Sequence, residues 1–69
     1  MQSVKKSFCF TCRADLAACV NYIIRFIPFS SLETWGDGVP QVTFEIKPGD
    51  AANVAFFLND HGIKYTAIV

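Results

Sequence analysis

Residues 41–62 read QVTFEIKPGDAANVAFFLNDHG, and the spacing of their apolar side chains changes partway along. In residues 41–47 apolar and polar side chains alternate, which is typical of a half-buried strand. In residues 51–61 the apolar side chains recur every three or four positions, which indicates one face of a helix. The stretch therefore predicts a strand that leads directly into a helix.

The residues around this helix predict its ends. Asp50 precedes it, and we expect this carboxylate to be the N-cap. Gly62 follows it and suits the left-handed position after a helix. Residues 63–69 then alternate again, so we expect a last strand that runs to the end of the chain.

The first half of the chain follows the same plan. Residues 4–12 alternate, with two phenylalanines on one face, and predict a strand. Residues 14–27 predict a helix that ends before Pro28, because the residue before a proline avoids the α region. The stripe expected to face the core consists of Leu16, Cys19, Val20, Ile23 and Ile27.

The middle of the chain is the least regular part. Residues 30–35 are compatible with a short strand, although two serines weaken that assignment. Gly36-Asp37-Gly38 and Pro40 predict a hairpin connection to the next strand. The order strand–helix–strand–strand–helix–strand predicts an α+β fold. It resembles the ferredoxin-like βαββαβ sandwich, whose four-stranded antiparallel sheet carries two helices on one face.

Length and charge limit the classes of function. The chain has 69 residues, enough for one domain over residues 1–69, and 52% of them are hydrophobic. Its formal net charge is zero, and the open face of the central strands offers no aromatic ring on which bases would stack. We therefore expect no nucleic-acid partner.

No segment has the character of a membrane span or a secretory signal. Residues 16–29 are the longest apolar stretch, but they are shorter than the ~20 residues that a span needs and contain Asn21 and Arg25. Arg13 and Asp15 interrupt the region where a signal peptide would be apolar. We expect a soluble, cytoplasmic protein.

The three cysteines leave thiol or metal chemistry as an alternative. Cys9 and Cys12 form a CxxC pair, and zinc would accept them together with Cys19 and His61. On an extended strand, however, residues three apart point to opposite faces and stand about 10 Å apart. The odd number of thiols fits a reducing compartment better than a disulfide framework. We expect no metal and no cofactor.

The fold plan and the first helix also resemble ACT-type regulatory domains. Those domains usually begin this helix with Asp, a Pro-Gly pair and Leu, and this chain has Ala14-Asp15-Leu16 there. The resemblance implies a small-molecule regulatory domain with its ligand near Arg13 and Asp15.

Surplus aromatic residues point to a protein partner. No nucleophile or phosphate-loop motif occurs, and His61 stands alone, so we expect no enzyme activity. Several aromatic side chains fall outside the expected core, and such residues anchor protein interfaces. The expected contact residues are Trp35, Phe56 and Tyr22, with Glu45 and Lys47 as a polar rim.

These residues predict a non-enzymatic protein–protein interaction module. It would form a homodimer or dock on a larger protein. Small plain proteins of this kind are frequent in phages and mobile elements, where they inhibit host enzymes by covering a surface. By that analogy, we expect an inhibitor that docks on a larger host protein or complex.

Overall fold

The computed structural model describes residues 2–35 and 38–68, which form four strands and two helices. Their bounds are β1 Val4–Phe10, α1 Arg13–Phe26, β2 Phe29–Trp35, β3 Gln41–Ile46, α2 Pro48–Asp60 and β4 Tyr65–Ala67. The uncertain middle segment is a strand of seven residues, one longer than 30–35. Two residues of the predicted hairpin turn, Gly36 and Asp37, lie outside the described residues.

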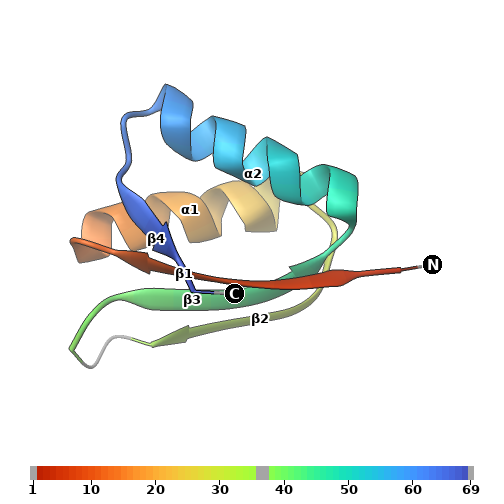
Figure 1. The fold of residues 1–69 in the computed structure, drawn as a ribbon, viewed down its shortest axis with the longest axis horizontal. Coiled ribbons are helices and arrows are strands. Elements are labelled where there is room, and N and C mark those ends of the chain that lie inside the picture. Colours follow the sequence, from red (N-terminus) through yellow and green to blue (C-terminus); the bar gives the residue numbers. More distant parts are fainter. Residues whose placement is uncertain (1, 36–37, 69) are drawn as a thin grey trace.

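The strands form one sheet in the order β2-β3-β1-β4, and every neighbouring pair is antiparallel. Figure 1 shows both helices on the same side of this sheet, so the molecule has a helix layer and an open sheet face. Each helix connects two parallel strands that are separated in the sheet by a third strand. The predicted α+β class, antiparallel sheet and one-sided helix layer are confirmed.

The core lies between the helices and the sheet. Phe8 of β1 packs edge-on against Phe44 of β3, with ring centroids 5.4 Å apart, and lies 4.8 Å from the Tyr65 ring of β4. The buried apolar side chains are Phe8, Phe10, Cys19, Ile23, Ile27, Val42, Phe44, Ile46, Val54 and Leu58. Both predicted helix stripes and the alternate strand positions therefore face this core.

The second helix begins earlier than predicted, which corrects the assignment of Asp50. α2 starts at Pro48, and Lys47 is the N-cap residue. Proline suits the first position of a helix, where no backbone N–H bond is required. The Asp50 amide already donates to the Lys47 carbonyl, at 3.0 Å, so Asp50 lies in the first turn and places its negative charge near the helix N-terminus.

The last strand is shorter than the predicted 63–69. Gly62 has a positive φ of 66°, and the Ile63 amide donates to the Leu58 carbonyl at 2.9 Å. This bond belongs to the capping turn of α2, so the strand starts only at Tyr65. β1 is shorter than predicted as well, because it ends at Phe10 and the chain bends before α1.

One polar pair is buried on the open face of the sheet. Ser7 and Thr43 stand opposite each other in β1 and β3, and each is 6% exposed. Their hydroxyl oxygens are 2.7 Å apart and share a hydrogen bond. The pair therefore satisfies two buried hydroxyls and fixes the register of the two central strands.

Candidate interaction surface

β2 has β3 on one side only, and its backbone on the other side is available for pairing. The Phe10 amide donates to the Pro40 carbonyl at 2.9 Å. Pro40, just before β3, therefore bonds to β1. Successive residues of a central antiparallel strand bond alternately to its two neighbours, so the even-numbered residues of β3 bond to β1 and the odd-numbered ones bond to β2.

The same alternation identifies the backbone amides and carbonyls of β2 that are not bonded to β3. Glu33 stands opposite the odd-numbered Thr43 and is bonded to β3, whereas Leu32 stands opposite the even-numbered Phe44. The amides and carbonyls of Leu32 and Thr34 therefore point away from the sheet. An edge of this kind is a template for a strand of another chain.

A β-bulge near the start of β2 shifts which of its residues stand opposite β3. Phe29 pairs with Ile46 and Ser31 pairs with Glu45, so Ser30 is the extra residue. The Ser30 hydroxyl donates to the Glu45 carbonyl at 3.3 Å. The residues after the bulge, 31–35, form a regular ladder and make the longest stretch of straight edge.

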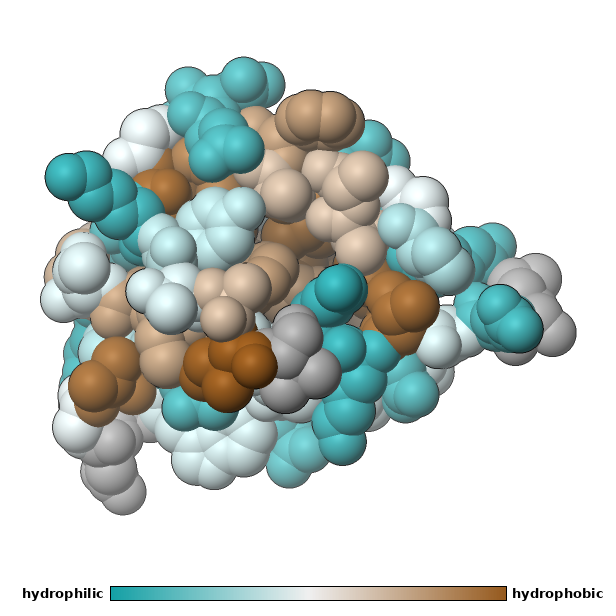
Figure 2. Space-filling model, viewed as in Figure 1, coloured by the Kyte–Doolittle hydropathy of each residue, from teal (hydrophilic) through white to brown (hydrophobic). Residues whose placement is uncertain are grey.

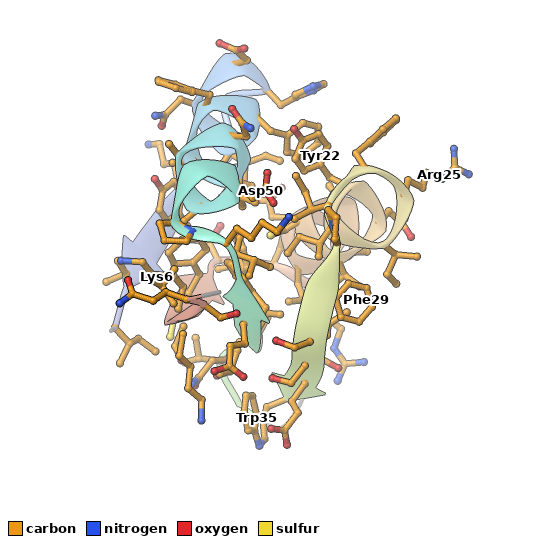
Figure 3. The ribbon with its side chains drawn as sticks, turned by 90° about the vertical axis from the view of Figure 1, so that its right-hand side faces the viewer. Lys6, Tyr22, Arg25, Phe29, Trp35 and Asp50 are labelled. Atoms are coloured by element: carbon orange, nitrogen blue, oxygen red, sulfur yellow. The ribbon has the colours of Figure 1, made fainter. Side chains whose placement is uncertain are left out.

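Apolar side chains are exposed along this edge. Ile24, Phe26 and Phe29 are 57%, 69% and 43% exposed and lie at the end of α1 and the start of β2. They line a shallow hollow of about 430 Å³ together with Arg25. Figure 3 shows Arg25 and Phe29 on the same flank of the molecule, beside α1 and β2. We call this flank, with β2 itself, the β2 edge surface.

Three of the predicted contact residues border the β2 edge surface. Trp35, 44% exposed, is the last residue of β2 and stands opposite Gln41 on the open face, on the side away from the helices (Figure 3). Glu45 and Lys47 lie near the other end of β2, where they line a small hollow with Phe29. The structure thus brings these polar residues to the start of the strand and the tryptophan to its end.

Tyr22 and Phe56 lie elsewhere, on the helix layer. Phe56 is on the solvent side of α2 and is 64% exposed, because Val54 and Leu58 take the core face. Tyr22 stacks on Phe57 across the two helices, with centroids 4.1 Å apart and planes at 11°. One flat partner surface would therefore not contact Trp35, Phe56 and Tyr22 at once.

The Tyr22 stack belongs to a row of four rings across the helices, which apolar periodicity did not reveal. Phe26 lies 5.5 Å from Tyr22, and His61 lies 4.4 Å from Phe57. Both pairs are four residues apart on a helix, and that spacing is the sequence signal for ring contacts within each helix. The pairing between the helices depends on the tertiary packing.

A third hollow, which we call the Lys6 hollow, lies between α2 and the strands β1 and β4. Lys6 occupies a helix-facing position of β1 opposite the buried Phe44, and three alanines of α2 lie beside it. The hollow measures about 290 Å³ and is lined by Lys6, Phe8, Ala51, Ala52, Ala55, Tyr65 and Ala67. Figure 2 shows it as a depression in a pale brown, weakly apolar surface. The short β4 leaves this part of β1 uncovered.

The three thiols lie in three different environments. Cys9 is half-buried on the open face, with its sulfur 4.0 Å from the Gln41 side-chain oxygen, and Cys12 is exposed before α1. Cys19 is buried in the core, and burial raises the pKa of its thiol to about 12. Within residues 2–35 and 38–68, no group of three potential ligands is arranged to hold a metal ion.

The residues implied by the ACT resemblance lie where α1 begins. Arg13 is exposed and is the first residue of α1, and Asp15 is half-buried in the first turn. Among the helices that the structure describes, none is both long and apolar enough to cross a membrane.

Comparisons with protein-family models, with curated proteins and with solved structures gave no match.

Proposed function

We propose that this chain is a ferredoxin-like βαββαβ domain that acts as a non-enzymatic protein–protein interaction module through its β2 edge surface. The strand order β2-β3-β1-β4 with antiparallel neighbours supports the ferredoxin-like assignment. The proposed function rests on the outward backbone amides and carbonyls of Leu32 and Thr34, which lie beside exposed apolar side chains. A partner that contributes an extended segment would gain main-chain hydrogen bonds from this edge and side-chain contacts from its flank.

The partner is a protein, either a second copy or a larger host protein that the domain inhibits by covering it. The latter follows the analogy with small phage and mobile-element proteins, for which size and plain composition are the support. Trp35 is the anchor at the end of the strand, because its ring is 44% exposed and tryptophan is among the residues that most often dominate binding energy at interfaces. Glu45 and Lys47 form its polar rim at the start.

The test is a binding comparison between two variants at one position of the edge. Thr34→Pro removes an amide that points away from the sheet, so the domain itself loses no ladder bond while strand addition is blocked. Thr34→Val keeps the amide and is the matched control. We expect a tagged Thr34→Val protein to retain from a lysate of the source cells whatever the wild type retains, and Thr34→Pro to lose it.

Single alanine variants then decide between the three surfaces. Trp35→Ala lies on the β2 edge surface, Tyr22→Ala in the ring row and Phe56→Ala on the outer side of α2. We expect only Trp35→Ala to weaken binding. Retention by Thr34→Pro together with loss in Phe56→Ala or Tyr22→Ala would move the interaction site to the helix layer and refute the proposal.

A second candidate function is an ACT-like small-molecule regulatory domain. Its ligand was expected near Arg13 and Asp15, which do not line the Lys6 hollow, so the hollow favours binding of a small molecule at a different place. A lysine among the otherwise apolar residues that line this hollow suits a small anion with an apolar body. A thermal-shift screen with amino acids, nucleotides and small carboxylates tests this function, since a ligand that binds only the folded state raises Tm. A rise in Tm that Lys6→Met abolishes would support it, and no rise with any ligand would remove it.

A further inference from the structure

We infer that the β2 edge surface pairs with the β2 edge surface of a second copy, antiparallel and with Leu32 on the two-fold axis. This inference rests on the proposed function and names its partner. It predicts an eight-stranded sheet that continues across the dimer.

Apart from the bulge at Ser30, which lies before the regular stretch 31–35, the strand carries few of the features that usually block edge pairing. Proteins protect an exposed edge with inward charges, lysines or prolines. β2 reads FSSLETW, and Glu33 is its one charged residue. Its length of seven residues is also at or above that of the other strands, so the edge is long as well as open.

Hydrogen-bond phase restricts the register of such a pair. The backbone groups of Leu32 and Thr34 point away from the sheet. In an antiparallel pair such residues must stand opposite residues of the copy that also point outward. The two-fold axis can therefore pass through residue 32, 33 or 34. Leu32 is the middle residue of β2, so an axis there pairs residues 31–33 of the two copies in the regular ladder and brings Thr34 opposite Ser30, the bulge residue. An axis at Thr34 would overlap only the last residues of the strand.

Charge repulsion distinguishes the two remaining registers, those with the axis at Leu32 and at Glu33. With the axis at Glu33, the two glutamates would stand directly opposite each other as a non-bonded pair, with Cα atoms about 4.5 Å apart. Like charges in this position are destabilising. With the axis at Leu32, Glu33 faces Ser31 of the copy, and the leucines form an apolar pair on the helix side.

The flank of the edge suits a copy of itself. It carries one positive side chain, Arg25, and one negative side chain, Glu33, so this flank has no net charge and two copies do not repel each other there. A stable interface buries about 800 Å² on each partner. That is under a fifth of the 4373 Å² surface of the chain, and Ile24, Phe26 and Phe29 supply exposed apolar area beside the strand.

The first test is the mass in solution by sedimentation equilibrium over micromolar to millimolar protein. We expect wild type and Thr34→Val to reach twice the 7.7 kDa chain mass, and Thr34→Pro to raise the dimer Kd by about 100-fold or more through lost backbone bonds. Circular dichroism confirms that Thr34→Pro is folded. A Thr34→Pro protein that dimerises like the wild type would overturn the inference.

A wild type that stays monomeric throughout would also overturn self-pairing. The proposed function would then still stand if Thr34→Pro lost a different partner that Thr34→Val retained, so the two failures are distinguishable.

Cross-linking tests the register. In a background with Cys9→Ser and Cys12→Ser, Leu32→Cys places two thiols on the axis, within the Cα separation that a disulfide needs. Thr34→Cys is the control, because Thr34 would stand opposite Ser30 and lie about 13 Å along the strand from its counterpart. Oxidation should link Leu32→Cys alone. Linking of Thr34→Cys instead would overturn the Leu32 axis.

Discussion

At the scale of single residues, two buried groups show how the core limits chemistry. Cys19 belongs to the apolar stripe of α1 and is fully buried, which separates it from Cys9 and Cys12. Ser7 and Thr43 satisfy each other on the open face. Both features concern stability, and neither one supplies a reactive group.

The Cys19 thiol predicts a loss of stability in alkali. Burial raises its pKa to about 12 from 9.0, so above about pH 9 the unfolded chain loses this proton and the folded chain keeps it. The free energy of unfolding should therefore fall as pH rises between about 9 and 12, by about 1.4 kcal/mol for each pH unit. Cys19→Ala should lack this component, although it is less stable at neutral pH.

Urea unfolding at about pH 8 and pH 10 measures this effect in both proteins. All other side chains are shared by the two proteins, so the difference between wild type and Cys19→Ala isolates the thiol. An equal alkaline loss in both proteins would show that Cys19 does not stay protonated in the fold.

The hydroxyl pair predicts strong coupling between Ser7 and Thr43. Thr43→Val leaves the buried Ser7 hydroxyl without its partner and should lower the free energy of unfolding by about 1–2 kcal/mol. Ser7→Ala should do the same to Thr43, while the double variant should recover much of the loss. A double-mutant cycle from chemical unfolding measures the coupling, and strictly additive losses would contradict it.

At the scale of elements, the strongest periodic patterns were correct, whereas several of the element boundaries were not. β3 and both helices followed from their spacing, because the buried face of each element has only one partner layer. The start of α2 was wrong by three residues, since its first residue is Pro48 rather than Ala51. The start of the last strand was wrong because the chain after Gly62 first closes the helix.

The turn after α2 predicts a difference between two glycines. Gly62 has φ of +66°, whereas Gly49 lies in the first turn of α2, and a Cβ at either one would meet open space. Gly62→Ala should therefore cost about 1 kcal/mol through backbone strain alone. Gly49→Ala should be neutral or stabilising by up to about 1 kcal/mol. Equal effects on Tm in the two variants would contradict this account of the turn.

At the scale of the whole molecule, the sequence indicated which side chains are surplus but not where they meet. Trp35 and Phe56 are exposed as the apolar stripes implied, yet they lie on different surfaces. The exposed cluster of Ile24, Phe26 and Phe29 could not be found by periodicity, because it forms only when β2 packs beside the end of α1. The ring row and the Lys6 hollow likewise depend on tertiary packing.

The two edge strands of the sheet differ in length. β4 spans three residues and pairs with the middle and end of β1, while β2 exposes a full-length strand edge with an apolar flank. A small domain with a closed core has few other places to gain a large contact area. The proposed pairing along β2 would bury the surplus apolar residues near that edge.

Amide hydrogen exchange by NMR at low and high protein concentration tests this pairing most directly. We predict that the amides of Leu32 and Thr34 exchange quickly in dilute protein and become protected as concentration rises, while the Phe44 amide, bonded within the sheet, is protected throughout. If the Leu32 and Thr34 amides exchange equally fast at every concentration, β2 does not pair with a second copy.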